Sequence, residues 1–586
     1  MHEESRQCQN CKSAFTIDAS DFTFYEKIKV PPPTWCPECR YQRRLTNRNE
    51  WNFYRRPCGL CKKEIISIHN PNYSGTVYCQ PCFWSDKWNP LGYGMEYDFS
   101  RPFFDQFKEL RLKTPRIAMA NTKSVNSEYT NQSEENKNCY LCVSTGNCEN
   151  CIYGYWNNGS RDCVDCYMVE KCELLYESVN CTKCSSSAYL QNCSDCLASY
   201  FLKDCRGCTN CFGCYGLRGK SNFWFNEQLT KEEYQKRLSE FVLTRENIKN
   251  TLLKLRDIEL REPHKYYNGK NNLVPSGDYL EETKYTNTSF NCRHAENIKY
   301  CQDAWFSKES YDCTEVFSQF CYEIEGCIAN RSSFVAKTWE VFDSWYLDLC
   351  YNSHDLFGCI SLRKKEYCIL NKQYSKEEYN ELLPKIIEHM KSTKEWGEFF
   401  PASISSFAYN ETVAQDYFPL SKEEAISKGY SWYERKDRDY VINIKPYELS
   451  KTIAEIDDSI LEKTILCKTQ LSEEEKREYI NCTTAFKITK AELDFYRKMG
   501  LPLPEKCFHD RRKDRMALRS PRKLWRRQCA CDYQSYKNIT KHEHHPEGRC
   551  PTEFETSYAP DRPEIVYCEQ CYQQEVAREQ ALGARL

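Results

Sequence analysis

Four Cys-x-x-Cys pairs stand close together near the start of the chain, and they constrain its fold more than any other feature. Such a pair places two thiolates on one zinc ion at Zn–S distances of about 2.3 Å, so two pairs complete a tetrahedral site. The stretch therefore predicts two structural zinc sites, each with four protein ligands and no position left open for catalysis. Both sequential and interleaved pairing fit the spacing, and we favour sequential pairing. The predicted ligands are Cys8, Cys11, Cys36, Cys39, Cys58, Cys61, Cys79 and Cys82.

The same module returns near the end of the chain with some of its ligands replaced. Three matched pairs share a constant offset of 471 residues: Cys11 and Cys482, Cys36 and Cys507, and Cys58 and Cys529. At that offset Tyr479 stands where the first module has Cys8, and Asp510 stands where it has Cys39. The second module is therefore predicted to be a degenerate copy of the first.

The second module still contains enough donors for further metal sites. A third site would use Cys467, Cys482, Cys507 and either His509 or Asp510. A fourth would use Cys529, Cys531, Cys568 and Cys571. An insertion before the last pair adds donors that are either metal ligands or part of a surface loop, namely His542, His544, His545 and Cys550. The expected cofactor is Zn²⁺, with two ions in the first module and one or two in the second.

Between the modules, a polar residue followed by Cys-x-x-Cys recurs at short intervals. Cys181, Cys193 and Cys205 step by twelve residues. Periods this short are typical of a β-solenoid, in which each turn buries its inward face on the next. Asn or Asp before the cysteine suits a corner, because these residues tolerate a left-handed backbone. Three interpretations of the cysteines remain open: a buried ladder of reduced thiols, further zinc sites, or disulfides and a redox relay.

A second, related segment follows the first. Cys214 and Cys359 differ by 145 residues, and each segment leads into a helix opened by a capping pattern, Thr230-x-x-Glu233 and Ser375-x-x-Glu378. Cysteines become rarer in the second segment and aromatic residues more frequent, which favours the packing interpretation.

The predicted fold is multidomain and mainly β with helices. Duplicated zinc-ribbon modules at both ends flank two short cysteine- and aromatic-rich β-solenoid-like segments, each followed by an amphipathic helix. The expected boundaries are a zinc module at 1–95, a helical linker at 96–125, the first repeat at 126–225, a helix at 226–262, a loop at 263–284, the second repeat at 285–370, a helix at 371–396, a connector at 397–465 and the degenerate zinc module at 466–580.

Composition narrows the cellular setting. A net charge of −2 gives no global field that would drive the chain onto nucleic acid or membrane. No apolar run approaches the roughly 20 residues needed to cross a bilayer, and the first residues lack a secretion signal. The 39 cysteines are an odd number and many have metal spacing. We therefore expect a soluble cytoplasmic protein without a membrane partner, and the oligomeric state stays open.

Arginines gather between the cysteine pairs of both modules, with aromatic residues among them. Arginine neutralises phosphate and aromatic rings stack on unpaired bases, so this pattern favours binding of nucleic acid, RNA or single strands first, without strong sequence specificity. The candidate residues are Arg40, Arg43, Arg44, Arg48, Arg55 and Arg56 in the first module and Arg511, Arg515, Arg519, Arg526 and Arg527 in the second.

Two other function classes remain open. The repeats and zinc ribbons would also suit a scaffold for protein partners. A redox or metal-storage protein would use the Cys-x-x-Cys pairs directly, but a thioredoxin-like pattern and the common catalytic motifs are missing from the sequence. We therefore expect a protein that is not an enzyme.

Several longer motifs resemble a known group of proteins. They include QCQNCKSAF, FYEKIKVPPPTWCPECRYQRRL, DCRGCTNCFGC and EFFPASISSFAYNETVAQDYFP. With them, nearly the whole chain resembles the uncharacterised cysteine-rich zinc-ribbon proteins of ultrasmall candidate-phyla (patescibacterial) bacteria. The resemblance implies zinc binding and no defined activity.

Overall fold

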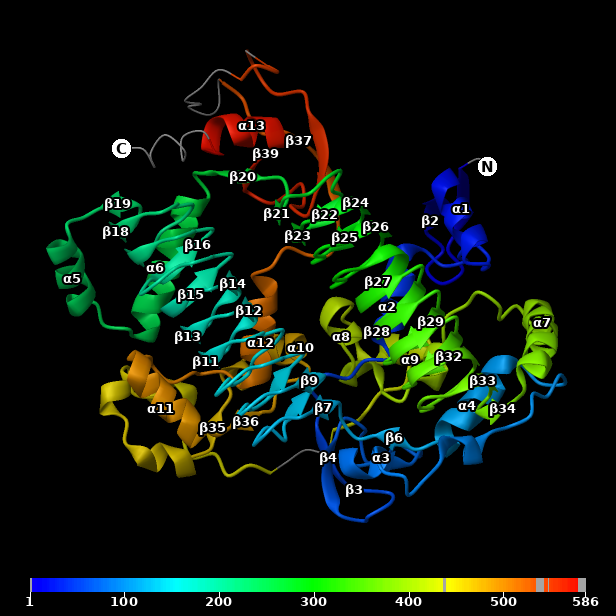
Figure 1. Cartoon of the computed structure of the whole chain (residues 1–586). Helices are drawn as coiled ribbons and strands as arrows, with labels where there is room; N and C mark the ends of the chain where they lie inside the picture. Colours follow the sequence, from blue (N-terminus) through cyan, green and yellow to red (C-terminus); the bar gives the residue numbers. More distant parts are fainter. Residues whose placement is uncertain (1–2, 436–438, 534–541, 546, 578–586) are drawn as a thin grey trace.

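The computed structural model describes residues 3–435, 439–533, 542–545 and 547–577. Over these residues the chain is a large mixed α/β protein with more strand than helix. Two stacks of β-coils form its centre, and the cysteine-rich ends of the chain pack around them (Figure 1). We call residues 121–224 the first β-stack and residues 269–369 the second β-stack.

Parallel pairing between residues one coil apart builds the first β-stack. Cys163 pairs with Leu175, and Leu175 pairs with Ser187, so one coil spans twelve residues. The twelve-residue step seen in the sequence is therefore the length of a coil. Its strands are β7 (Asn121–Thr122), β8 (Thr130–Asn131), β9 (Ser133–Glu134), β10 (Cys142–Val143), β11 (Arg161–Val164), β12 (Tyr167–Glu170), β13 (Glu173–Tyr176), β14 (Val179–Thr182), β15 (Ser185–Gln191), β16 (Tyr200–Lys203), β17 (Thr209–Phe212) and β18 (Ser221–Trp224).

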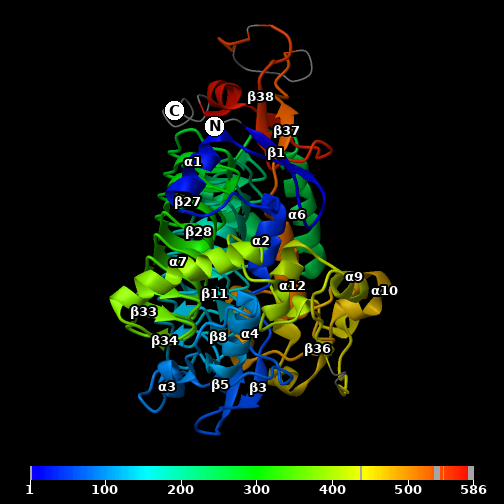
Figure 2. The same ribbon diagram turned by 90° about the vertical axis from the view of Figure 1, so that its right-hand side faces the viewer.

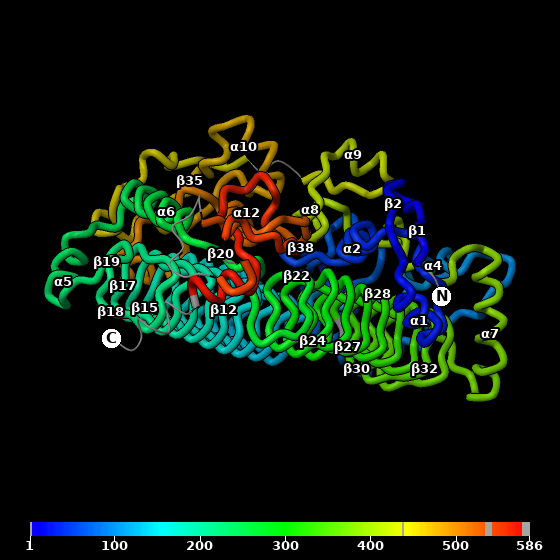
Figure 3. The backbone as a smooth tube through the Cα atoms, turned by 90° about the horizontal axis from the view of Figure 1, so that it is seen from above, coloured from blue at the N-terminus to red at the C-terminus, as the bar shows by residue number. Residues whose placement is uncertain are grey.

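The second β-stack follows the same plan with some shorter coils. Ile298 pairs with Ser310 twelve residues on, whereas Cys313 pairs with Ile324 eleven residues on. Figure 3 shows the coils of both stacks as two adjoining rows of parallel loops. The strands are β21 (Gly269–Lys270), β22 (Gly277–Asp278), β23 (Leu280–Glu281), β24 (Lys284–Asn287), β25 (Ser289–Phe290), β26 (Glu296–Lys299), β27 (Lys308–Gln319), β28 (Tyr322–Asn330), β29 (Ser333–Ala336), β30 (Trp339–Phe342), β31 (Trp345–Asp348), β32 (Tyr351–Phe357) and β33 (Glu366–Ile369).

Strands of the second β-stack also join into a ring. β28 pairs with β29, β29 with β31, β31 with β32, β32 with β30, and β30 with β28. The ring closes because β28 and β32 each continue around a corner and pair on two faces. The repeat period predicted a solenoid-like segment, and this prediction needs correction, because the strands close into a parallel β-barrel.

Left-handed corners divide each coil into short sides. Asn138, Leu141, Ser144 and Asn147 all have φ near +50°, at every third position. The predicted corner residues before cysteine adopt this conformation, and so do bulkier residues for which it is unfavourable. Stacked side-chain amides stabilise one of these corners. The side-chain N–H of Asn138 donates to the side-chain oxygen of Asn150 at 3.1 Å, which forms part of an amide ladder along the stack.

Buried thiols fill the interior of the first β-stack. Its fifteen cysteines between Cys139 and Cys214 form one core cluster, and each is at most 2% exposed. Cys172 is typical: its Sγ lies 3.4 Å from the carbonyl of Glu170 and 3.5 Å from that of Cys181. Ser160 uses its hydroxyl in the same pattern. This geometry favours the ladder of reduced thiols among the three interpretations.

Helices cover the far end of each stack. After β19 (Glu227–Gln228) the structure has two helices, α5 (Lys231–Glu240) and α6 (Arg245–Glu259), where the sequence predicted one helix at 226–262. The break occurs because the Thr244 hydroxyl caps a new helix by accepting the N–H of Asn247. After β34 (Lys372–Gln373), α7 (Lys376–Ser392) begins with the predicted capping box of Ser375 and Glu378.

The two cysteine-rich modules have matching elements. The first contains β1 (Glu4–Gln7), β2 (Ala14–Ile17), α1 (Ala19–Lys27), α2 (Pro37–Leu45), β3 (Tyr54–Pro57), β4 (Glu64–Ser67), β5 (Val77–Tyr78) and α3 (Gln80–Phe83). The second contains β35 (Ile465–Leu466), α10 (Glu473–Glu478), β36 (Ala485–Phe486), α11 (Lys490–Met499), α12 (Phe508–Ala517), β37 (Trp525–Gln528), β38 (Glu553–Thr556), β39 (Ile565–Tyr567) and α13 (Glu569–Tyr572).

Each module touches both stacks. In the first module β5 pairs with β6 (Arg116–Ile117), which leads through residues 118–120 into the first β-stack, while α2 packs on β27 and β28 of the second. In the second module β39 pairs with β20 (Pro263–Lys265), just before the second β-stack, while α11 packs on β11 of the first. Figures 1 and 2 place β3 and α3 at one end of the molecule and β37 and β38 at the other.

The remaining helices join these parts. α4 (Phe103–Lys113) packs its phenylalanines against the aromatic core beside the second β-stack. The connector after α7 holds α8 (Ala414–Tyr417) and α9 (Lys422–Ser427). Across the part of the chain that the structure describes, no helix combines the length and the apolar character needed to cross a membrane.

Candidate metal centres and a central cavity

The first module brings its eight predicted ligands together as two groups of four thiols. One group is Cys8, Cys11, Cys36 and Cys39, and the other is Cys58, Cys61, Cys79 and Cys82. Within each group all sulfur atoms lie within 4.8 Å of one another. Zn–S bonds of about 2.3 Å in a tetrahedron separate sulfurs by roughly 3.8 Å. Each group could therefore hold one zinc ion, with the sequential pairing that we favoured.

Local hydrogen bonds prepare these thiols for a metal. The backbone N–H of Cys36 donates to Cys8 Sγ at 3.2 Å, and that of Cys79 donates to Cys58 Sγ at 3.3 Å. Burial acts to raise the pKa of Cys58, but backbone N–H groups outweigh it and lower the pKa to about 6. A thiol with this pKa is largely thiolate at neutral pH, the form that binds metal.

A third group forms at the start of the second module. Cys467 Sγ lies 3.0 Å from Asp510 Oδ2, and Cys507 Sγ lies 3.9 Å from Cys482 Sγ. The N–H of Cys507 donates to Cys467 Sγ at 3.1 Å, the same bond that links Cys36 to Cys8. Burial and the Cys507 thiolate raise the pKa of Asp510 to about 6. Three thiols and one carboxylate thus converge as a possible Cys₃Asp site.

Strand register corrects the sequence alignment at this site. Cys467 directly follows β35, as Cys8 directly follows β1. β35 pairs with β36 in the same antiparallel way in which β1 pairs with β2. Cys467 therefore takes the place of Cys8, whereas Tyr479 lies away from the group and donates its hydroxyl to Asp514. α10 is inserted between the two ligands of this pair and hides their correspondence in the sequence.

His509 is not part of the third group. Its ring lies against Phe508 with centroids 3.9 Å apart, and its Nδ1 is buried without a hydrogen-bond partner among the described residues. Burial lowers the pKa of His509 to about 3, so the ring stays neutral. Of the two alternatives from the sequence, Asp510 is the residue that lies beside the thiols of the third group.

The end of the second module holds a larger cluster of donors than the sequence predicted. Cys529 groups with Cys550, Cys568 and Cys571, so Cys550 takes the position that we had given to Cys531. Cys531 instead groups with His542, His545 and Cys571. The two groups share the thiol of Cys571. Residues 534–541 and 546 of the insertion lie outside the described residues.

The geometry of the shared thiol fits two neighbouring ions. His545 Nε2 lies 3.2 Å from Cys571 Sγ, and His542 Nδ1 lies 3.4 Å from Cys531 Sγ. The other nitrogen of His542 contacts the Glu575 carboxylate at 3.1 Å, which orients the ring as carboxylates do behind zinc-bound histidines. His544 Nε2, at 3.2 Å from Cys571 Sγ, offers one more donor. Two ions bridged by the Cys571 thiolate would together be coordinated by the cysteine and histidine donors of this cluster.

Cys571→Ser is expected to remove about two zinc ions per chain, because a hydroxyl replaces a thiolate shared by two groups. Cys531→Ser, which touches one group only, is the matched comparison and is expected to remove one. Elemental analysis of protein purified under reducing conditions gives both numbers. Equal losses from the two variants would contradict the shared thiolate.

The arginines of α2 are buried in ion pairs with the second β-stack. Arg40 and Arg44 both contact Asp312, at 2.7 and 3.2 Å. Arg44 also reaches Glu323, which occupies the matching position one coil further on, at 3.3 Å. Arg43 pairs with Glu323 at 2.8 Å. The side chains of these residues are at most 5% exposed.

The arginines of α12 repeat this arrangement on the first β-stack. Arg511 and Arg515 both contact Asp165, at 2.9 and 2.8 Å. Arg515 also contacts Glu177, one coil further on, at 3.0 Å. In each module, the helix that begins after a cysteine of a candidate metal group therefore inserts two arginines, four residues apart, between carboxylates of two neighbouring coils.

Burial corrects the expectation that these arginines face a nucleic acid. Six of the eleven candidates are at most 6% exposed and paired with carboxylates, so they cannot reach a phosphate in the folded protein: Arg40, Arg43, Arg44, Arg48, Arg511 and Arg515. Their acidic partners carry no recognisable motif. Their only signal in the sequence is their position at matching corners of successive coils.

The other candidates have different surroundings. Arg55 and Arg526 are exposed and pair with glutamates across their strand ribbons, at 3.0 and 2.6 Å. Arg56 and Arg527 donate to backbone carbonyls. Arg519 lines a cavity.

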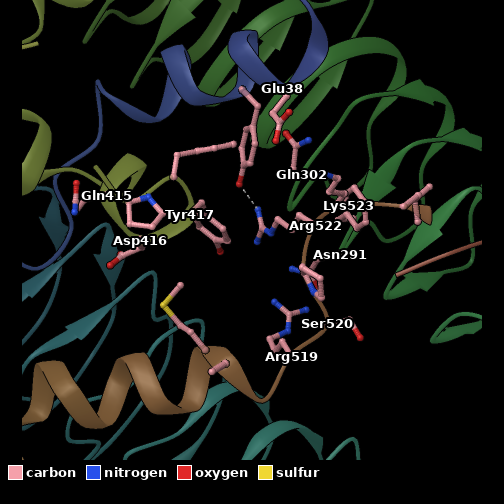
Figure 4. Close-up of a pocket in the computed structure, with 18 of the residues that line it drawn as sticks. Glu38, Asn291, Gln302, Gln415, Asp416, Tyr417, Arg519, Ser520, Arg522 and Lys523 are labelled. Carbon is pink, nitrogen blue, oxygen red and sulfur yellow. Dashed lines mark hydrogen bonds between the residues drawn. The ribbon is translucent and has the colours of Figure 1, made fainter. Parts of the chain in front are cut away.

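This cavity of about 980 Å³ lies between the two stacks and both modules. Tyr41 from α2, Tyr167 from the first β-stack, Tyr279 from the second and Tyr417 from α8 contribute aromatic walls. Figure 4 shows Arg519 and Arg522 reaching into it from the segment after α12. Other lining residues include Asn291, Gln302, Gln415, Asp416 and Lys523. Sequence reasoning missed the cavity, because its walls come from many segments that lie far apart in the chain.

Comparison with known proteins adds no family to these observations. No protein-family model matches the chain, and a search of curated proteins also finds no match. The structure by itself supports a cysteine-rich protein with several groups of cysteines, near both ends of the chain, that could bind zinc.

Proposed function

We propose that this chain is a non-catalytic zinc-binding protein whose metal sites hold two β-stacks in a fixed relation and so form a rigid scaffold for a binding partner. The observation that carries the proposal is the crossed attachment of the modules. α2 begins after a cysteine of the first site and forms ion pairs with the second β-stack. α12 begins after a cysteine of the third site and forms ion pairs with the first β-stack.

The chemistry of the sites supports a structural role for the metal. Each group supplies four protein donors, which is the coordination number of a closed zinc site. Such a site contributes to folding because the metal binds the folded chain far better than the unfolded one. Nucleic-acid binding is less well supported, since most of the arginines that favoured it are buried.

Zinc removal under reducing conditions tests the proposal. A chelator is expected to release α2 and α12 from the stacks. Amide hydrogen exchange in residues 37–45 and 508–517 should then become roughly tenfold faster or more, which corresponds to a free energy of local opening that is lower by about 1.4 kcal/mol. Exchange in β13 to β16 should stay slow, because the thiol core needs no metal. The control is the same chelator saturated with zinc. Unchanged exchange in both helices, or simultaneous loss of both stacks, would contradict the scaffold.

A further inference from the structure

Arg519 differs from the arginines of α2 and α12 that are paired with carboxylates of the stacks. At the offset of 471 residues it corresponds to Arg48, which is 1% exposed and pairs with Glu50 at 2.6 Å and with Glu315. Within the described residues, no carboxylate lies within ion-pair distance of Arg519, and its Nε is buried without a hydrogen-bond partner. The position thus keeps the charge of its counterpart but lacks the carboxylates that neutralise it.

Two tyrosine rings hold the Arg519 guanidinium in place. Its Cζ lies 4.3 Å from the centroid of Tyr279 and 5.5 Å from that of Tyr167. The rings come from different stacks, so this contact fixes the guanidinium where the stacks meet. Cation–π contacts of this kind position a guanidinium but do not replace a counter-charge.

The neighbouring arginines of the cavity already have partners. Arg522 bonds to the Tyr41 hydroxyl at 2.8 Å and to Asp303 at 2.8 Å. Arg512 pairs with Asp416 at 2.8 Å. Glu38 lies on α2, across the cavity from Arg519 in Figure 4. An anion that enters the cavity would therefore meet a guanidinium that is held in place by two tyrosine rings and has no carboxylate partner among the described residues.

We propose that the cavity binds a nucleotide-sized organic phosphate, with its anionic group on Arg519. A guanidinium binds phosphate through two parallel hydrogen bonds, and burial strengthens them. The volume is at the upper end of the range usual for small-molecule sites. Tyr41 and Tyr417 add aromatic surface to the wall, with Arg522 over the ring of Tyr417, and the amides of Asn291 and Gln302 belong to the polar part of the lining.

The site does not depend on the proposed scaffold role, and the two can fail separately. The scaffold proposal concerns exchange of α2 and α12 after zinc removal. The phosphate site concerns binding to the zinc-loaded protein. Zinc content is measured in every variant, so that a loss of binding is attributed to Arg519 only where the metal is retained.

Calorimetric titration of the zinc-loaded full chain with AMP tests the site, with adenosine as the probe that lacks the anion. AMP is expected to bind and adenosine to bind about tenfold or more weakly, because a charge-assisted hydrogen bond contributes at least that factor. Arg519→Gln should weaken AMP binding by a similar factor, and Arg519→Lys should recover part of it. The matched control is Arg526→Gln, which removes an exposed arginine of β37.

Three results would overturn the proposal. The first is no binding of AMP or inorganic phosphate at millimolar concentration. The second is equal AMP binding by wild type and Arg519→Gln. The third is tight binding of an unphosphorylated single-stranded oligonucleotide that Arg519→Gln leaves unchanged, because this would assign the basic residues to a nucleic acid instead.

Discussion

Asp312→Asn is expected to lower the free energy of unfolding by about 3–5 kcal/mol. Asp312 is fully buried and receives both Arg40 and Arg44. An amide of the same size removes this counter-charge and leaves the guanidinium groups of Arg40, Arg43 and Arg44 to share the Glu323 carboxylate. Desolvation of unpaired charge is the dominant cost of such a change. Chemical denaturation of the zinc-loaded protein, followed by tryptophan fluorescence, measures the loss.

Three further variants make this result specific. Asp165→Asn is expected to cost a similar amount, because Arg511 and Arg515 converge on Asp165 in the same way. Glu64→Gln breaks the exposed pair with Arg55 and should change stability by less than about 1 kcal/mol. A triple change of Arg40, Arg44 and Asp312 to apolar residues should recover most of the loss, since the buried charges that remain, Arg43 and Glu323, pair with each other. A loss from Asp312→Asn no larger than that from Glu64→Gln would mean that α2 is not held by these pairs.

Cys58→Ser is expected to remove one zinc ion and to unfold the segment from β3 to α3 locally. Cys58 is fully buried and accepts the N–H of Cys79, so both Cys-x-x-Cys pairs of its group depend on it. Structural zinc contributes apparent binding energies of about 10–16 kcal/mol in small zinc-binding peptides, which makes this the largest effect expected here. The change should spread to β6, because β5 pairs with it at the entrance to the first β-stack. Elemental analysis and amide exchange of residues 54–83 measure both effects.

Cys172→Ser is the matched control for this substitution. Cys172 is equally buried, but its Sγ contacts backbone carbonyls that a hydroxyl can also reach, as Ser160 does one coil earlier. The zinc content of this variant should equal that of the wild type. Loss of zinc from Cys172→Ser would mean that the thiol ladder itself holds metal and would revive the storage interpretation. Retention of all zinc by Cys58→Ser would remove the second N-terminal site.

Much of the architecture followed from spacing that local chemistry imposes. Two thiolates two residues apart fit one tetrahedral ion, so Cys8 to Cys82 predicted two groups that the structure brings together. The twelve-residue step of Cys181 and Cys193 matched the coil length, because a stack of coils repeats its inward positions at a fixed period. The corner conformation of Asn138 followed in the same way from its tolerance of positive φ.

Contacts between distant segments were beyond reach from the sequence. The inserted α10 concealed that Cys467 replaces Cys8, and only the pairing of β35 with β36 restored the register. The ligand exchange between Cys531 and Cys550 depends on how the insertion folds back. The ring of β28, β29, β31, β32 and β30 depends on which strands continue around a corner, and periodicity does not encode this.

The sequence by itself determined which residues of the first module can share a metal ion and which positions of a coil point inward, because both follow from short, fixed spacings along the chain. Only the tertiary structure decided the role of the arginines. In sequence, Arg40, Arg511 and Arg519 look alike, each a cation in a basic segment. Their surroundings differ because Asp312 and Asp165 are brought to the first two from hundreds of residues away, whereas Arg519 meets a cavity. A charge becomes structural or available for a ligand according to what is packed against it, and that is set by the whole fold.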